Sequence, residues 1–392
     1  MLHVPGFRFS AVAAGIRKDG RIDTALAVSD TPASVAGLFT RNLVRAAPVL
    51  VAAERARSGT ARAVLVNSGC ANACTGDAGL AAVRDSTAAV ARALSVSPEL
   101  IVPASTGVIG AVLPADRIAA HADELVAKLS VDRSDDFATA IMTTDRWKKT
   151  AVATIKAGQG SVNLLAIGKG AGMIHPDVGP PQATMLVFLF TDARVDPKEL
   201  ERALVLASDD TFNACSVDGD TSTNDTVLAM ASGASGLSLA SDALVPAFTE
   251  GCDTLARSMV ADGEGATHAV ELKVSGLASR EDARAVARTV ATSLLVKTAL
   301  FGQDANWGRL LAAAGRAGVA FDPAQASIYV GLVHVVGNGV TLGKSAEEYA
   351  NAVMQEPAYS IELVLGDGPG RARYYTSDIG HTYVDVNAGY RS

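Results

Sequence analysis

The chain is poor in aromatic residues, in cysteine and in positive charge. Aromatic residues make up 5% of its 392 residues, and four residues are cysteines. Acidic residues outnumber basic ones by 41 to 34, so the basic face that nucleic-acid binding requires is not expected. No apolar run approaches the length of about 18 residues that a membrane helix needs, so we expect no membrane partner. The first ten residues lack the apolar core of a signal peptide, which predicts a cytoplasmic protein.

The four cysteines do not form a metal-binding or disulfide pattern. Cys70 and Cys74 are four residues apart, but no second pair or nearby histidine completes a zinc site. Our interpretation is that these two, with Cys215 and Cys252, are buried free thiols. Near-matches to a dinucleotide loop, a P-loop and a calcium loop each miss an essential residue; the first has Met173 where glycine is required. No metal and no organic cofactor is therefore predicted.

Apolar residues, at 49% of the chain, are abundant and occur in short segments of two kinds. Strand-like and amphipathic helical segments are mixed along the sequence, which favours a layered α/β or α+β fold over a pure β-barrel. Strands are predicted at residues 22–40, 62–67, 101–110 with a loop, 151–155, 162–167, 185–190, 327–336, 359–366 and 372–377. Helices are predicted at residues 80–94, 115–129, 197–207, 244–261, 280–300 (as one helix or a broken one) and 346–355.

The most unusual stretch runs from Gly168 to Leu186. Glycines surround Lys169, a proline-rich turn follows, and Ala183–Thr184 leads directly into an apolar run. A fully apolar run this short is typical of a buried strand, so Thr184 would be the first residue of a central strand. Two interpretations of Thr184 remain open: a β-branched residue that suits a strand start, or a nucleophile.

As a nucleophile, Thr184 would need a base beside its hydroxyl. One solution is the α-amine of the threonine itself, whose pKa of about 7.7–8.0 leaves much of it unprotonated near neutrality. Thr184 is internal, so this amine exists only if the Ala183–Thr184 bond is cut. The nucleophile hypothesis therefore requires self-cleavage into residues 1–183 and 184–392.

Short motifs spread over almost the whole chain carry a family resemblance. They are V-P-G-F (4–7), A-S-T-G-V-I-G (104–110), I-M-T-T-D (141–145), K-G-A-G-M-I-H-P (169–176), A-T-M-L (183–186), D-T-S-T-N-D (220–225), D-G-E-G-A-T (262–267), N-W-G-R (306–309) and N-A-G-Y-R-S (387–392). Together and in this order, they resemble the ornithine acetyltransferase family of bifunctional glutamate N-acetyltransferases. The resemblance implies cleavage between Ala183 and Thr184, and an αββα sandwich with a second, smaller domain.

The resemblance also implies an activity in the cyclic route of arginine biosynthesis. The acetyl group of N-acetylornithine would pass to glutamate through an acetyl-Thr184 intermediate, with ping-pong kinetics. Acetyl-CoA would be an optional second donor, as in bifunctional relatives. The two chains made by cleavage would assemble into a heterotetramer or a larger oligomer. From the residues alone, an aminopeptidase or amidase with the same nucleophile and an uncut binding protein remain alternatives.

Individual residues receive roles from the same resemblance. Thr106 and Gly107 would stabilise the oxyanion, although the residues alone favour a plain turn after the strand that begins at Ile101. Lys169 would pair with a substrate carboxylate and Glu264 with an ammonium group. The alternatives from the residues alone are a solvated loop lysine and an exposed charge after a helix.

The last motif would complete the substrate site. Besides Thr184, the resemblance assigns substrate binding to Asn387 and to the final residue, Ser392. Chain ends are usually frayed, so this role predicts that the last six residues are ordered.

Two departures from the family pattern concern substrate choice and cleavage. Arg146 stands where the family usually has a threonine after T-T-D, at a position that would contact substrate. The segment Asp177–Gln182 is longer than the usual pair of residues before the cleavage site. Since cleavage depends on strain in this loop, its length affects how efficiently the bond would break.

Overall fold

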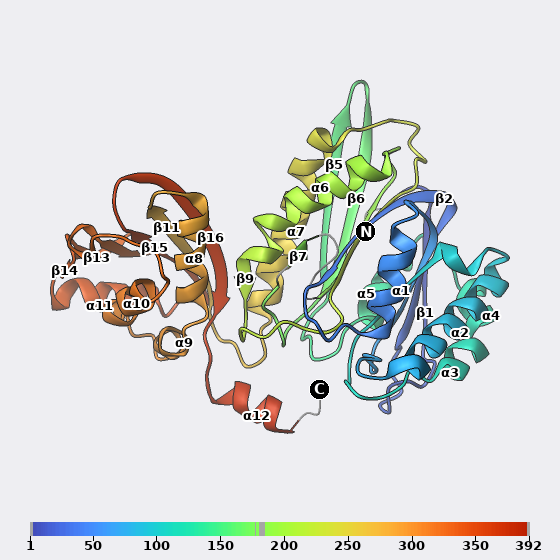
Figure 1. Ribbon diagram of the computed structural model, residues 1–392, viewed down its shortest axis with the longest axis horizontal. Coiled ribbons are helices and arrows are strands. Elements are labelled where there is room, and N and C mark those ends of the chain that lie inside the picture. Colours follow the sequence, from blue (N-terminus) through green and yellow to red (C-terminus); the bar gives the residue numbers. More distant parts are fainter. Residues whose placement is uncertain (1–2, 177, 180–184, 390–392) are drawn as a thin grey trace.

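The computed structural model describes residues 3–176, 178–179 and 185–389 (Figure 1). The cleavage-site residues Ala183 and Thr184, and the terminal Ser392, therefore lie outside the described residues. The described chain forms a larger lobe and a smaller lobe, each with its own sheet.

The larger sheet has nine strands within the described residues, in the order β4-β3-β2-β10-β8-β6-β5, with β1 and β7 also paired to β2. Their bounds are β1 (Phe7–Val12), β2 (Thr24–Thr40), β3 (Thr60–Asn67), β4 (Ile101–Ser105), β5 (Lys149–Ala157), β6 (Gly160–Lys169), β7 (Val178–Gly179), β8 (Leu186–Thr191) and β10 (Thr226–Ala231). Every residue of β8 is buried, and the strand lies between β10 and β6. The apolar run after the cleavage motif is therefore the central buried strand that the sequence predicted.

The long strand β2 folds this sheet back on itself. Its 17 residues would span roughly 55 Å if they were straight. Thr24 at its start pairs with Asn67, and Phe39 near its end pairs with Thr226. Asn67 and Thr226 lie close together. Ser105 Oγ donates to Asn67 Oδ1, and the carbonyl oxygen of Ser105 accepts from the side chain of Asn224, two residues before Thr226. The strand must therefore bend, and its ladder with β3 shifts register in the middle.

The bend produces two β-layers with a shared inner core. On β8, Phe188 and Phe190 enter this inner core, where they pack edge-to-face against Phe137 with ring centroids 5.3 and 6.2 Å away. Val187 and Leu189 point the other way and pack under α6 and α7. The outer face of the other β-layer is covered by α2, α3 and α4. The larger lobe is thus an αββα sandwich.

The helices of the larger lobe are α1 (Ala47–Ala56), α2 (Gly76–Leu94), α3 (Ala115–Ala120), α4 (Ala122–Ala127), α5 (Ser134–Ala140), α6 (Pro197–Asp209) and α7 (Ser241–Ala261), with short 3-10 turns η1 (Pro98–Leu100) and η2 (Phe212–Ala214). Pro197 occupies the first turn of α6, where a proline costs no hydrogen bond, and Asp196 caps that helix by accepting from Lys198 N. The described parts of residues 1–183 and 184–392 both contribute to the larger sheet, since β6 pairs with β8 and β2 with β10.

The smaller lobe has its own sheet and hydrophobic core. Its strand order is β14-β13-β12-β15-β11-β16-β9. The strands are β9 (Cys215–Ser216), β11 (Ala269–Gly276), β12 (Ser327–Val330), β13 (Val333–Gly337), β14 (Val340–Thr341), β15 (Ala358–Val364) and β16 (Gly368–Ser377). The helices are α8 (Arg280–Ala291), α9 (Leu294–Phe301), α10 (Trp307–Gly315), α11 (Lys344–Val353) and α12 (His381–Gly389), with a 3-10 turn η3 (Pro323–Gln325). Helix α12 leaves the smaller lobe and lies below both lobes in Figure 1.

Most predicted helices and strands appear at or near their predicted positions, but three of them are each divided into two elements. The predicted helices at 115–129 and 280–300 are each broken into two, and the predicted strand at 327–336 is a pair of strands joined by a turn. The sequence analysis missed β1, β10, β11, α1, α5, α10 and α12, and also the two-residue strands β7, β9 and β14. The cysteine interpretation is wrong for one residue: all four thiols are free, but Cys74 is exposed because it lies in the loop that enters α2.

Candidate active site

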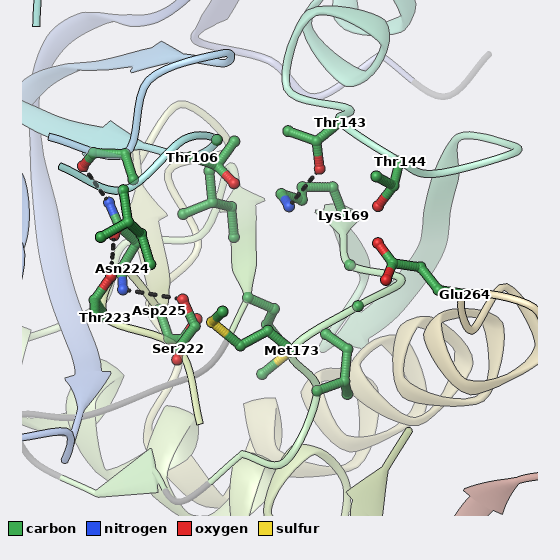
Figure 2. Close-up of a pocket in the computed structure, with 18 of the residues that line it drawn as sticks. Thr106, Thr143, Thr144, Lys169, Met173, Ser222, Thr223, Asn224, Asp225 and Glu264 are labelled. Carbon is green, nitrogen blue, oxygen red and sulfur yellow. Dashed lines mark hydrogen bonds between the residues drawn. The ribbon is translucent and has the colours of Figure 1, made fainter. Parts of the chain in front are cut away.

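A pocket lies where β4 and β6 end and β8 and β10 begin (Figure 2). Five of the residues singled out from the sequence line it: Thr106, Gly107, Lys169, Glu264 and Asn387. They come from four separate segments, because Thr106 and Gly107 are adjacent, and the fold of β2 and the path of α12 bring these segments together. The other two, Thr184 and Ser392, lie outside the described residues.

Thr106 and Gly107 follow directly after β4. Gly107 has a φ of +128°, and a Cβ at this position would stand 2.4 Å from the carbonyl carbon of Gly69. Only glycine fits there without moving the neighbouring backbone. Within the described part of the chain, neither the Thr106 hydroxyl nor the Gly107 N–H has a hydrogen-bond partner. Two donors are therefore available to a ligand, which is what an oxyanion site requires.

Lys169 is the last residue of β6 and is buried. Its Nζ donates to Thr143 Oγ1 at 3.1 Å. Burial lowers the pKa of Lys169, while the nearby Asp145 carboxylate opposes this shift. Lys169 is thus a buried pocket cation and not a solvated loop residue.

Asp145 holds together the part of the wall around this lysine. Its Oδ1 accepts from Gly170 N at 2.7 Å and from Lys149 Nζ at 2.7 Å, and its Oδ2 accepts from Thr143 N at 3.0 Å. Burial acts to raise the pKa of Asp145, but the charges of Lys169 and Lys149 outweigh it and lower the pKa. Asp145 therefore stays ionised beside the pocket.

Arg146, the departure from the family pattern, turns away from the pocket. Its Nε and backbone N donate to the two carboxylate oxygens of Asp262 at 2.8 and 3.0 Å, and its guanidinium lies 4.8 Å from the Trp147 ring centroid. It is not among the pocket-lining residues, whereas Thr143 and Thr144 of the same motif are. Arg146 therefore forms an ion pair between a half-exposed guanidinium and the buried carboxylate of Asp262, and it does not line the pocket.

Glu264 is half-buried and lines the pocket, where its carboxylate packs against the backbone of Gly172. A Cβ on Gly172 would stand 2.3 Å from Glu264 Cδ, so a side chain at position 172 would exclude this carboxylate. Asn387 Nδ2 donates to Glu264 Oε2 at 3.0 Å and thereby connects α12 to the pocket. Asn387–Gly389 form the end of that helix, and the rest of the predicted ordered terminus lies outside the described residues.

The sequence analysis missed several lining residues that carry polar groups. Figure 2 shows Lys169 and Glu264 on one side of the pocket with two of them, Thr143 and Thr144. On the other side, beyond Thr106, lie the remaining ones, which form the segment Ser222–Asp225. Both segments were among the motifs that carry the family resemblance, I-M-T-T-D (141–145) and D-T-S-T-N-D (220–225), but no site role was assigned to their residues.

Asp218, in the same loop, positions a neighbouring part of the pocket. Its carboxylate accepts from Met173 N at 2.6 Å and Ile174 N at 2.9 Å, and both of those residues line the pocket. Burial raises the pKa of Asp218 to about 6.

Other kinds of site were sought in residues 3–176, 178–179 and 185–389. No group of three or more His, Cys, Asp and Glu side chains in these ranges is arranged to hold a metal ion. None of the helices that they form is both long enough and apolar enough to cross a bilayer.

The fold and the pocket define a class of protein: a layered α/β enzyme that places paired hydrogen-bond donors opposite a buried amine and a carboxylate. Comparison with known proteins identifies the family. The sequence matches the ArgJ family over residues 8–392. The chain therefore belongs to the ArgJ family, which confirms the resemblance to ornithine acetyltransferases.

Two relatives match this chain over its whole length, and a solved structure matches about half of it. The arginine biosynthesis bifunctional protein ArgJ of Geobacter sulfurreducens is 47% identical over 397 residues, with 100% of each chain covered. The protein of the same name from Desulfotalea psychrophila is 46% identical over 400 residues, again with 100% of each covered. The crystal structure of the bifunctional protein ArgJ from Bacillus halodurans has 38% identity and a TM-score of 0.50; the match covers 52% of this chain and 98% of that one.

Proposed function

We propose that the protein transfers the acetyl group of N2-acetylornithine to glutamate in arginine biosynthesis, through an acetyl ester on Thr184. The observation that carries this proposal is the pocket itself. Met185, the residue bonded to Thr184, lines the same pocket as Thr106, Gly107 and Lys169. The names of the two bacterial relatives, which include arginine biosynthesis, support the same pathway.

In the proposed first step, the Thr184 hydroxyl oxygen attacks the acetyl carbonyl carbon, and the α-amine of Thr184 takes the hydroxyl proton. The carbonyl oxygen becomes negatively charged and accepts hydrogen bonds from the Thr106 hydroxyl and the Gly107 N–H. The C–N bond then breaks, the proton passes to the departing amine, and ornithine leaves. Lys169 would bind the substrate carboxylate, while Glu264 would bind the side-chain ammonium group.

In the second step, the amine of glutamate attacks the acetyl ester on Thr184. The ester C–O bond breaks, the proton from the amine returns to the threonine oxygen, and N-acetylglutamate leaves. Because donor and acceptor react in turn at one residue, initial rates should show ping-pong kinetics. Asn387 and Ser392 would complete the binding site, and acetyl-CoA would serve as a second donor to the same hydroxyl.

The α-amine requires cleavage at Ala183–Thr184, which is part of the proposal. Two observations support it. The match to the Bacillus halodurans structure covers 98% of that chain but 52% of this one. This is the coverage expected if that chain is one product of a cut near the middle. In addition, β6 and β8 are neighbours in one sheet although they lie on opposite sides of the cut, so both products would stay assembled. We expect the two-chain unit to associate further, into a heterotetramer or larger, in the cytoplasm.

Intact mass spectrometry of the purified protein tests the cleavage. We expect two masses, for residues 1–183 and 184–392, and Thr184 as the first residue of the second chain. Thr184→Ala should give one uncut chain, because the hydroxyl is lost, and Thr184→Ser should still be cut. Thr150→Ala, on the exposed edge of β5, is the matched control and should be cut normally. A wild-type protein that remains a single chain would rule out the proposed mechanism, because Thr184 would have no free α-amine.

Transfer is tested by incubating the cut enzyme with N2-acetylornithine, with and without glutamate. We expect N-acetylglutamate and ornithine in equal amounts. Release of acetate at the same rate without glutamate would instead indicate an amidase. Replacing the donor by acetyl-CoA then shows whether the second donor is used.

A further inference from the structure

We propose that Asn224 is the positioning residue that sets the geometry of the oxyanion donors Thr106 and Gly107. This inference rests on the proposed function of those two residues. Asn224 is 5% exposed and belongs to the segment that leads into β10. Its effect would appear in the rate of the chemical step and not in the binding of substrate.

The side-chain amide of Asn224 is fully engaged with the protein. Its Nδ2 donates to the carbonyl oxygens of Ala71 at 2.6 Å and Ser105 at 2.9 Å, and its Oδ1 accepts from Thr223 Oγ1 at 2.7 Å. Both N–H groups are therefore used, and none remains to donate to a substrate. Asn224 must act through its neighbours.

Those neighbours are the two backbone segments that define the donors. Ser105 directly precedes Thr106, and the backbone around Ala71 includes Gly69, against which Gly107 packs without room for a Cβ. One NH₂ group thus clamps the segment 69–71 to the segment 105–107, and the contacts span 153 and 119 residues of sequence. The spacing of the two segments sets where the Thr106 hydroxyl and the Gly107 N–H lie.

A second buried amide fixes the same strand end from the other side. Asn67 Oδ1 accepts from Ser105 Oγ at 2.6 Å, and the Asn67 carbonyl accepts from Thr106 N at 3.0 Å. Asn67 holds β4 to β3, within one β-layer. Asn224 is the group that ties this strand end to the other layer, which carries β8 and β10. It therefore sets the position of the donors relative to the start of β8.

An amide is the side chain that this position requires. Two carbonyl oxygens face Nδ2, so a carboxylate there would place like charges together, and a hydroxyl has only one hydrogen to donate. Asn224→Asp keeps the size and removes both donors. Asn224→Ser keeps one donor and should fall between Asp and the native residue.

The experiment compares the steady-state kinetics of cut Asn224→Asp enzyme with those of the wild type, using N2-acetylornithine as donor. Losing an oxyanion donor outright typically costs 10²–10³ in kcat, so misplacing both should lower kcat by about 10–100-fold. KM should stay within about threefold, because the charged groups that bind substrate are untouched. Asn224→Ser should recover part of the loss. Only molecules shown by mass spectrometry to be cut are counted as active sites.

A double variant separates positioning from general damage to the fold. If Asn224 acts through the oxyanion donors, Asn224→Asp should cost much less in a Thr106→Ala background than alone. Asn351→Ala is the control, since Asn351 Oδ1 accepts from Ala305 N at 2.8 Å in the smaller lobe; its kcat should stay within twofold. Equal losses in both backgrounds, or an unchanged kcat in cut Asn224→Asp, would overturn the inference. A wild type that does not transfer acetyl would instead overturn the proposed function.

Discussion

The two sides of the pocket are built from different interactions. The neutral wall, defined as Thr106 and Gly107 with the buried amides Asn67 and Asn224, is held entirely by uncharged hydrogen bonds. The charged wall is defined as Lys169 and Glu264, which line the pocket, together with Asp145 beside Lys169; all three are buried or half-buried. Both walls are tied to neighbouring backbone, but of these two sets of residues only the charged wall contains groups that titrate. Asp225, next to Asn224, also lines the pocket and is a carboxylate outside both sets.

This difference separates two tasks of the site. Hydrogen bonds between neutral buried groups fix atoms at defined spacings and do not change with pH. Buried charges bind charged substrates strongly, but their pKa values depend on every nearby charge. Under the proposed function, damage to the neutral wall should therefore reduce kcat, and damage to the charged wall should raise KM and shift the pH dependence.

The largest effect is expected for Gly107→Ala, on the neutral wall. A methyl group 2.4 Å from the backbone of Gly69 forces the two loops apart and moves the N–H of residue 107. We expect kcat to fall by about 10³ or more with N2-acetylornithine as donor, since both loops carry the oxyanion geometry. Gly110→Ala is the matched control: it also has a positive φ, of +89°, but nothing lies within 4 Å of its added Cβ. An active Gly107→Ala enzyme would remove Gly107 from the oxyanion site.

The next effect is expected for Lys169→Met, on the charged wall. A hydrogen bond to a charged group contributes about 1.5–3 kcal/mol, so losing the ammonium group should raise KM for the donor by roughly 10–100-fold. The reduction in kcat should be smaller, because the oxyanion donors remain in place. Lys156→Met, an exposed change on β5, should leave both constants unchanged. A large loss of kcat with an unchanged KM would assign Lys169 to the chemistry and break the division between the walls.

The pH dependence of KM tests whether Lys169 binds the substrate. Burial lowers the pKa of Lys169, so its positive charge is lost at a lower pH than for an ordinary lysine, and KM should rise on the alkaline side. Asp145→Asn removes a negative charge that favours the protonated lysine, so it should move this rise to still lower pH. A rise that stays at the same pH in Asp145→Asn would show that another group causes it.

The sequence could predict each wall only in part. The family resemblance assigned roles to Thr106, Gly107, Lys169 and Glu264, because each lies in a short glycine-containing motif that is visible along the chain. Asn224 was not identified, since its role depends on carbonyl groups 153 and 119 residues away. No local pattern encodes such a contact.

The same holds for the fold: elements that depend on the local sequence were predicted, and features that depend on contacts between distant segments were not. The sequence analysis predicted short strands within residues 22–40, and the structure has one long strand there, Thr24–Thr40. Its bend, which brings both strand ends to the pocket, was not predicted, because it depends on the distant residues Asn67 and Thr226 with which the two ends of the strand pair. Arg146 shows the reverse case: its motif placed it in the site, but its side chain reaches Asp262 instead.

The smallest effect is expected for Arg146→Thr, which restores the usual family residue. The Arg146 side chain is 52% exposed, so solvent screens its end of the ion pair, although Asp262 is buried; the pair should contribute about 1 kcal/mol to the free energy of unfolding. Asp262 keeps its bond of 2.6 Å to the buried Lys149. We therefore expect a small decrease in the urea midpoint and a KM within twofold of the wild type.

Lys149→Met is the contrasting variant for this last prediction. It leaves the buried carboxylates of Asp145 and Asp262 without their shared cation, and breaking a buried pair in this way costs about 3–5 kcal/mol. Urea unfolding of both variants, with KM measured alongside, compares the two positions directly. Because Arg146 lies outside the pocket lining, a tenfold change of KM in Arg146→Thr would mean that its side chain reaches the substrate, and the charged wall would then have to include it.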